Sequence, residues 1–153
     1  MEFRRLMVRY LAGAVLAPFL GTWPAAADPL LTYPLKIKGH TIRVEVANDE
    51  ASRHTGLMFR NALPEDGGMI FVYASEEFWA MWMRNTQVPL SVAFIDRAGR
   101  IINVEDMQPF TDASHEATAP ARYALEMNHG WFQKRSIRRG DRVLGLDRIP
   151  AAR

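Results

Sequence analysis

A series of short apolar segments, each bounded by a turn signal, constrains the fold of this chain more than any other feature. In residues 41–46, Ile42, Val44 and Val46 alternate with polar side chains. A period of two is typical of a β-strand with one buried face. Residues 35–38 precede this segment across a Gly39-His40 turn, so the two segments predict a β-hairpin.

The rest of the chain continues this pattern. Further strands are predicted at residues 69–73, 91–95, 100–104 and 122–127, and a turn with a last strand at 140–146. The segments 91–95 and 100–104 predict a second hairpin across the turn at residues 96–99. Short helices are predicted at residues 49–58, with Asn48 as the N-cap, and at residues 131–137. The regular spacing of strands and turns predicts a mainly β (α+β) domain, a small antiparallel β-barrel or sandwich with one or two short helices.

The first 27 residues have a different character. Arg4, Arg5 and Arg9 form a basic start, an apolar run covers residues 10–20, and residues 25–27 are Ala-Ala-Ala. This order predicts a signal peptide at residues 1–27, cleaved before a single domain at 28–153, and a periplasmic or secreted protein. The apolar run is shorter than the roughly 20 residues of a membrane span. We therefore expect no membrane anchor after cleavage.

Composition excludes several kinds of site. The chain of 153 residues has no cysteine, which rules out disulfides, zinc–thiolate sites and a cysteine nucleophile. Its formal net charge is +2, and three arginines and one glutamate lie in the predicted leader. The remainder is close to neutral, so no nucleic-acid partner is expected. The four histidines lack zinc-type spacing and there is no phosphate-binding glycine loop, so neither a metal nor a cofactor is predicted.

Residues 78–90 combine the largest apolar side chains with hydrogen-bonding groups. The segment reads FWAMWMRNTQVPL, with a Trp-Met cluster followed by Arg-Asn-Thr and then a proline. Aromatic faces beside amide and hydroxyl groups are typical of pockets for sugars, peptides or planar ligands. Trp82, Asn85 and Thr86 therefore predict a pocket wall with polar anchors. A second interpretation is a buried tryptophan with Asn85 and Thr86 forming a turn before Pro89.

Four ordered motifs resemble one protein family. They are RHTGLMFR at residues 53–60, GMIF at 68–71, WMRNTQVPL at 82–90, and YALE at 123–126 followed by Gly130 and Gly140-Asp141. In this order they are similar to the DUF192 family of bacterial and archaeal proteins. The resemblance implies a small β-rich domain, often exported, with no assigned activity. Many members have aspartate directly after the Pro-Leu pair, where this chain has Ser91.

Three charged residues are further candidates for a site. Arg53 and Arg60 are two helical turns apart, so on a helix they share a face and predict a clamp for a carboxylate or phosphate. Alternatively they cover the core or pair with Glu126 or Asp141. Glu126 lies within an apolar strand, where a carboxylate needs a partner. It predicts either a general acid or base with a raised pKa or an ion pair with an arginine.

We therefore expect an exported binding module whose ligand groove contains Arg53, Arg60, Trp82, Asn85, Thr86 and Glu126. Its partner would be a small molecule derived from the cell envelope or an envelope protein. One alternative is a hydrolase of envelope carbohydrate or a related ester, with Glu126 or Asp141 as acid or base. The other is a periplasmic copper protein that uses Met81 and Met83, or Met127 and His129, because thioethers and imidazole favour Cu(I).

Overall fold

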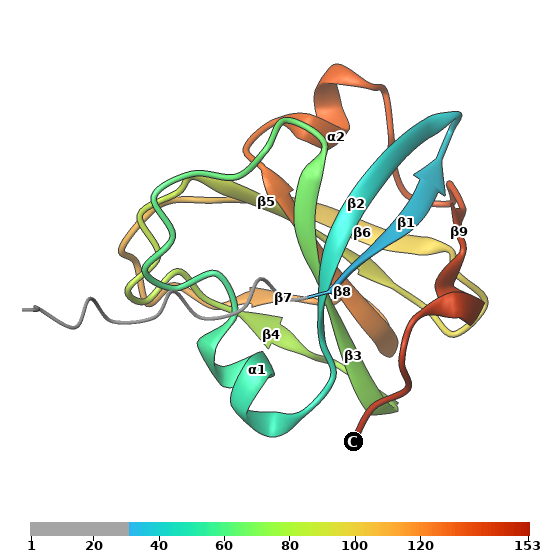
Figure 1. The fold of residues 1–153 in the computed structure, drawn as a ribbon, viewed down its shortest axis with the longest axis horizontal. Helices are drawn as coiled ribbons and strands as arrows, with labels where there is room; N and C mark the ends of the chain where they lie inside the picture. Colours follow the sequence, from blue (N-terminus) through green and yellow to red (C-terminus); the bar gives the residue numbers. More distant parts are fainter. Residues whose placement is uncertain (1–30) are drawn as a thin grey trace, which may run out of the picture.

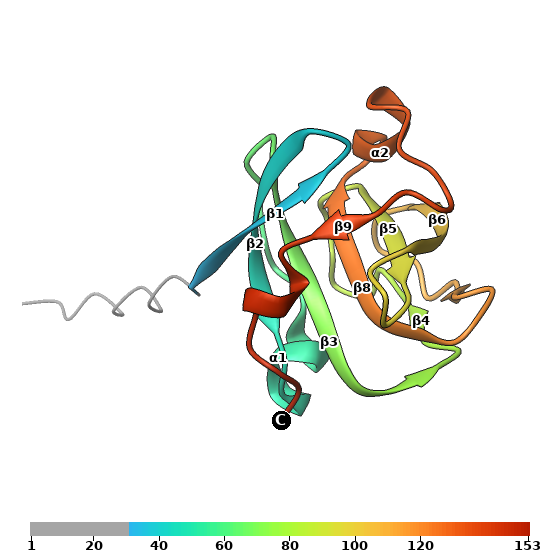
Figure 2. The same ribbon diagram turned by 90° about the vertical axis from the view of Figure 1, so that its right-hand side faces the viewer.

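The structure is a computed structural model that describes residues 31–153, and one curled β-sheet forms the centre of the fold (Figures 1 and 2). The order of strands in this seven-stranded sheet is β6-β5-β8-β3-β2-β1-β9. The strands are β1 (Thr32–Ile37), β2 (His40–Ala47), β3 (Gly67–Glu77), β5 (Leu90–Ile95), β6 (Ile101–Met107), β8 (Ala121–Asn128) and β9 (Val143–Leu144). A two-stranded sheet joins β4 (Ala80–Met81) to β7 (His115–Glu116). The helices are α1 (Glu50–Thr55), α2 (Trp131–Lys134) and a 3-10 turn at Leu146–Arg148.

The predicted mainly β architecture is confirmed, and one pairing differs from the antiparallel expectation. The β1–β2 and β5–β6 hairpins form as predicted, and β8 lies antiparallel between β3 and β5. However, β2 and β3 pair in parallel. Parallel neighbours need a crossover connection, and residues 48–66, which include α1, supply it. This crossover places α1 at the bottom of the domain in Figures 1 and 2, next to the end of β2.

Alternate side chains of the central strands form two buried clusters. Phe71, Phe94 and Ala124 belong to the first cluster, which also includes Met83 and Val88 from the segment after β4. The second cluster includes Ile70, Leu125, Trp131 and Phe132 and is covered by α2. Figures 1 and 2 show the two helices at opposite ends of the sheet, with α2 at the top and α1 at the bottom of both views. Each central strand has apolar residues on both faces, which explains its continuous apolar sequence.

Helix α1 is shorter than predicted. The helix begins after Asp49, whose side chain accepts a hydrogen bond from the backbone N–H of Ser52 at 2.8 Å, while the Ser52 hydroxyl accepts from the Asp49 N–H. This reciprocal pair is a capping box. The helix ends at Thr55, because the next residue, Gly56, has φ +48°, a non-helical backbone conformation that favours glycine. The prediction of a helix through residue 58 with Asn48 as its cap is therefore wrong.

Replacing Asp49 with alanine is expected to lower the melting temperature by a few degrees, because the N-terminal N–H groups of α1 lose their acceptor. Asp49→Ser should retain most of the stability, since serine also caps helices. Thermal melts of the full chain at pH 7 would compare the three proteins. Equal melting temperatures for wild type and Asp49→Ala would show that the capping box does not stabilise this fold.

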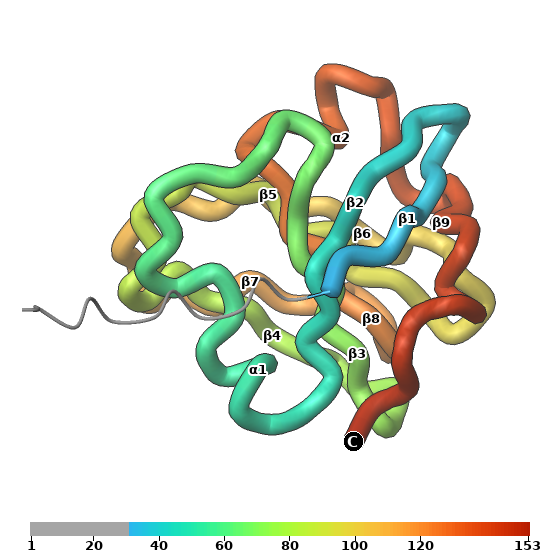
Figure 3. The backbone as a smooth tube through the Cα atoms, viewed as in Figure 1, coloured from blue at the N-terminus to red at the C-terminus, as the bar shows by residue number. Residues whose placement is uncertain are grey.

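The C-terminal segment returns to the start of the crossover connection. Asn48 donates from Nδ2 to the carbonyl of Ala151 at 2.7 Å, and the N–H of Arg153 donates to the Asn48 carbonyl at 2.6 Å. Figure 3 shows this segment descending beside β1 and β2 towards α1. Asn48 therefore binds the end of the chain rather than capping the helix. Within residues 31–153, no helix has the length and apolar character required to cross a membrane. The predicted signal peptide at residues 1–27 lies outside the described residues.

Candidate functional site

Four segments that are distant in sequence meet at a narrow crevice beside the C-terminal end of α1. The crevice has a volume of about 30 Å³ and is lined by residues 53–58, Phe71, Met81, Trp82, Thr86 and Glu126. Each of the four motifs at 53–60, 68–71, 82–90 and 123–126 contributes at least one of these residues. The parallel crossover brings the first motif over β3 and β8, where the second and fourth motifs lie.

Glu126 is a buried carboxyl group at this crevice. Its register partners are Met69 on β3 and Val92 on β5, which both belong to the first apolar cluster, so its side chain lies on the same face of the sheet. The residue is 3% exposed, and in residues 31–153 its carboxyl group has neither a hydrogen bond nor an ion pair. Burial raises the pKa of Glu126 to about 8. The alternative in which Glu126 pairs with an arginine is therefore wrong.

Tyr73 and Arg53 form the surroundings of this carboxyl group. Burial, followed by the charge of Glu126, raises the pKa of Tyr73, while the charge of Arg53 lowers it. These effects require the three groups to lie within electrostatic range of one another. The Arg53 guanidinium lies 5.9 Å from the centre of the Tyr73 ring and donates to the carbonyl of Val72 at 3.0 Å. The Tyr73 hydroxyl donates to Sδ of Met81 at 3.4 Å.

Arg60 lies outside the crevice. Because α1 ends before Gly56, Arg53 and Arg60 do not share a helical face, and the predicted two-arginine clamp is wrong. Arg60 instead makes a bidentate ion pair with Glu45 on β2, with N–O distances of 3.0 and 2.5 Å. Arg53 alone remains in the crevice, where it supplies one positive charge.

The predicted group of Trp82, Asn85 and Thr86 is divided by a turn. Trp82 and Thr86 line the crevice, and Asn85 does not. The N–H of Thr86 donates to the Met83 carbonyl at 3.1 Å, and Asn85 has φ +54°. These features form the turn that the second interpretation predicts before Pro89. Trp82 is 42% exposed, so the interpretation of it as a buried residue is wrong.

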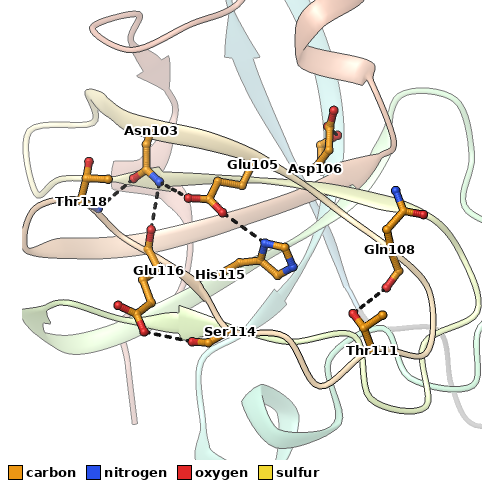
Figure 4. A network of polar contacts seen from close by, with 10 residues as sticks. Asn103, Glu105, Asp106, Gln108, Thr111, Ser114, His115, Glu116 and Thr118 are labelled. Atoms are coloured by element: carbon orange, nitrogen blue, oxygen red, sulfur yellow. Dashed lines mark hydrogen bonds and ion pairs between the residues drawn. The ribbon is translucent and has the colours of Figure 1, made fainter.

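A polar network holds the two-stranded sheet in place (Figure 4). His115 Nδ1 lies 3.1 Å from Oε2 of Glu105, and the Asn103 amide donates to Oε1 of Glu105 at 3.2 Å and to the carbonyl of Glu116 at 3.0 Å. His115 pairs with Met81 across β7 and β4. The network therefore positions Met81 in the crevice. It also holds part of the connection between β6 and β8 in place.

Ser91 lies on the opposite face of the sheet from Glu126. It is fully buried, donates a hydrogen bond to the Asp106 carboxylate and accepts one from the Gly130 N–H at 2.8 Å. Adjacent strand residues point to opposite faces, and Val92 shares the Glu126 face, so Ser91 points away from the crevice. Ser91 thus joins β5 to the N-terminal end of α2 and does not contribute to this site.

The crevice contains only part of each alternative site, because it includes Glu126 without Asp141 and Met81 without Met83. Asp141 accepts a hydrogen bond from the Arg138 N–H and pairs with Lys38 at 3.6 Å, and Glu126 is the one acidic residue in the crevice lining. Met83 and Met127 are both fully buried but belong to different apolar clusters. The described residues 31–153 contain no cluster of three His, Cys, Asp or Glu side chains able to hold a metal ion.

Comparison with known proteins establishes the family. The model of the DUF192 family, described as "Uncharacterized ACR", matches residues 33–145. The chain belongs to the DUF192 family. No match was found among curated proteins.

Two crystal structures are similar to this DUF192 domain. One is a candidate transcription regulator from Sinorhizobium meliloti 1021, with 32% identity, a TM-score of 0.73, and coverage of 76% of this chain and 95% of that chain. The other is a protein of unknown function from Novosphingobium aromaticivorans DSM 12444, with 31% identity, a TM-score of 0.74, and coverage of 78% and 89%.

The sequence analysis did not identify Tyr73, Met58 and Met81 as parts of this site. The sequence could have indicated Tyr73. It is two residues after Phe71 on a predicted strand, and residues two apart on a strand lie on the same face. Met58 and Met81 occur in apolar surroundings that are equally typical of a core. Only the parallel crossover, which the sequence did not predict, brings Met58 towards β4.

Proposed function

We propose that this DUF192 domain is an exported binding module, and that its ligand places a small hydrogen-bond-accepting group, a carboxylate, in the crevice above Glu126. The observation that carries the proposal is a 3% exposed carboxyl group without a partner in residues 31–153, at a crevice built from all four family motifs. Export rests on the leader sequence at residues 1–27.

The chemistry of the crevice favours an acceptor with negative charge. Below pH 8 the Glu126 carboxyl group is neutral and offers an O–H donor. Arg53 adds a guanidinium group, of which one N–H is used by the Val72 carbonyl. A carboxylate placed between them gains charge-assisted hydrogen bonds, which are stronger than those between neutral groups.

The size of the crevice limits what enters it. A volume of about 30 Å³ accommodates a group no larger than one or two water molecules. The carboxylate end of a ligand fits this space, whereas the rest of the ligand must lie outside it. Trp82 borders the crevice and is 42% exposed, so its indole ring is the surface on which the remainder would pack.

A thermal-shift titration of the full chain with D-alanyl-D-alanine tests this proposal, because that probe carries a free C-terminal carboxylate and represents cell-envelope peptides. At a hundred times its Kd, the probe should stabilise the protein by about 2.7 kcal/mol and raise the melting temperature by several degrees. D-alanyl-D-alaninamide lacks the carboxylate and should give no shift. Binding should weaken at least tenfold between pH 6 and pH 9, because Glu126 becomes negatively charged and repels the ligand.

The two arginines provide a matched pair of variants for the same titration. Arg53→Ala should abolish the shift, because Arg53 lines the crevice, whereas Arg60→Ala should retain it, because Arg60 pairs with Glu45 elsewhere. Trp82→Ala should weaken binding without unfolding the protein, since Trp82 is partly exposed. Equal shifts with the acid and the amide, or no shift with either, would contradict the proposal.

A further inference from the structure

Two phenylalanines beside the Asn85-Thr86 turn are exposed and do not line the crevice. Phe59 is 74% exposed and Phe110 is 68% exposed. They follow α1 and β6 respectively, and both line a hollow of about 290 Å³. The remaining lining residues are Asn61, Asn85 and Gln87. These five residues are called the aromatic platform below.

The backbone of the aromatic platform adopts conformations that its bulky residues disfavour. Phe59 has φ +64°, Phe110 has φ +58° and Asn85 has φ +54°. Asparagine tolerates this left-handed region, but a phenylalanine there is an outlier that requires external support. Hydrogen bonds provide that support, since the Phe59 N–H donates to the Asn85 carbonyl at 3.0 Å and the Phe110 N–H to the Thr86 carbonyl at 3.1 Å.

Folding stability does not explain phenylalanine at these two positions. Glycine or asparagine would adopt the same backbone with less strain. An exposed phenyl ring contributes little to the core, because its apolar surface remains in water. Exposed aromatic pairs with polar neighbours are typical of interaction sites. Two exposed rings at one hollow are therefore a candidate interaction site.

The polar groups of the platform are neutral amides. Gln87 Nε2 donates to Oδ1 of Asn61, and within residues 31–153 the remaining amide groups of Asn61, Gln87 and Asn85 have no other side-chain hydrogen bonds. These groups include both donors and acceptors. No charged residue lines the hollow. The complementary ligand is a neutral molecule with an apolar face and several hydroxyl groups.

We propose that the aromatic platform binds a neutral sugar, with a pyranose ring packed on Phe59 and Phe110 and its hydroxyl groups bound by the amides of Asn61, Asn85 and Gln87. A sugar ring combines an apolar C–H face with hydroxyl groups around its edge, which matches this arrangement of rings and amides. The site is distinct from the crevice, because Asn85 lines the platform and Thr86 lines the crevice. It does not depend on carboxylate binding there.

The test uses the ¹⁵N-labelled full chain and two neutral trisaccharides, maltotriose and N,N′,N″-triacetylchitotriose, followed by NMR. At least one trisaccharide should give saturable shifts in the side-chain NH₂ signals of Asn61, Asn85 and Gln87 and in the backbone signals of Phe59 and Phe110. Glycerol at the same hydroxyl concentration should not, because it has no ring to pack on the phenyl groups.

Variants separate binding from folding. The double variant Phe59→Asn/Phe110→Asn retains residues that suit the left-handed backbone, so its melting temperature should be unchanged or raised by a few degrees. Its affinity for the trisaccharide should fall at least tenfold. Phe78→Asn removes another exposed phenylalanine, 66% exposed and outside the platform, and should bind within twofold of wild type.

Three results would overturn the sugar proposal: no shifts with either trisaccharide, equal shifts with glycerol, or binding by the double variant within twofold of wild type. A fourth contradicting result could come from analytical sedimentation, which measures the oligomeric state. If the full chain dimerises with concentration and the double variant does not, the platform is a contact between copies of the chain. The two trisaccharides carry no carboxylate. A negative result with them would therefore contradict the sugar proposal but not the proposal that the crevice binds a carboxylate.

Discussion

Replacing Glu126 with glutamine is expected to stabilise the folded protein at pH 8 and to have little effect at pH 4.5. The pKa of Glu126 rises from an ordinary value of 4.5 to about 8 on folding, because burial disfavours the charged form. Between these values the folded state holds a proton that the unfolded state has released. The stability of the wild type therefore falls as the pH rises through this window.

The size of this effect follows from the separation of the two pKa values. Each pH unit between them removes about 1.4 kcal/mol of stability, so the full window corresponds to about 3 to 5 kcal/mol. Glutamine has nearly the same shape and does not ionise. The free energy of unfolding of Glu126→Gln should therefore exceed that of wild type by this amount at pH 8.5.

Urea unfolding of both proteins from pH 4.5 to 8.5 would measure the difference directly. All other ionisable groups occur in both proteins, so their contribution cancels in the difference. A constant difference at every pH would show that Glu126 does not titrate in this window. A growing difference would show that this position reduces stability at neutral pH, as binding sites commonly do.

Replacing Gly68 with alanine is expected to lower stability by about 3 kcal/mol or more, one of the largest effects of adding a methyl group to this fold. A Cβ atom at Gly68 would lie 2.2 Å from the backbone oxygen of Glu126 and 2.5 Å from Sδ of Met127. Gly68 pairs with Met127 across β3 and β8, so both strands must separate to admit the atom. The movement would also displace Glu126 from the crevice.

The neighbouring glycine provides a matched control. A Cβ atom at Gly67 would meet the Pro64 ring at 2.9 Å, and that ring belongs to a loop that can shift more easily than a paired strand. Gly67→Ala should therefore lose less than half the stability lost by Gly68→Ala, with a melting temperature decrease on the order of 10 °C for Gly68→Ala. Equal losses for the two variants would show that the strand spacing at Gly68 does not limit its side chain.

Much of the fold could be predicted because its signals are local. Alternating side chains identified the β1–β2 hairpin, and the turn at residues 96–99 identified the β5–β6 hairpin. The length of α1 was not predictable to the residue, because a glycine at position 56 is compatible with either the interior or the end of a helix. The two-residue strands β4 and β7 carry too few residues for a period to be recognised.

The candidate site was predictable in part. Arg53, Trp82, Thr86 and Glu126 were chosen from the sequence, and the structure brings these four together at one crevice. Arg60 and Asn85 were chosen by the same reasoning and lie elsewhere. Sequence spacing supported Arg60 only if the helix continued, and it did not show to which side of a turn Asn85 would point.

The mainly β class and the family could be inferred from the sequence alone, because hydrophobic alternation, turn residues and ordered motifs are properties of short segments. By contrast, the parallel pairing of β2 and β3, which brings the end of α1 to Glu126, is a result of long-range packing. Tertiary packing also leaves Glu126 without a partner among residues 31–153 and places Phe59 and Phe110 at the same hollow. Contacts of this kind depend on how distant segments pack, which no local pattern encodes.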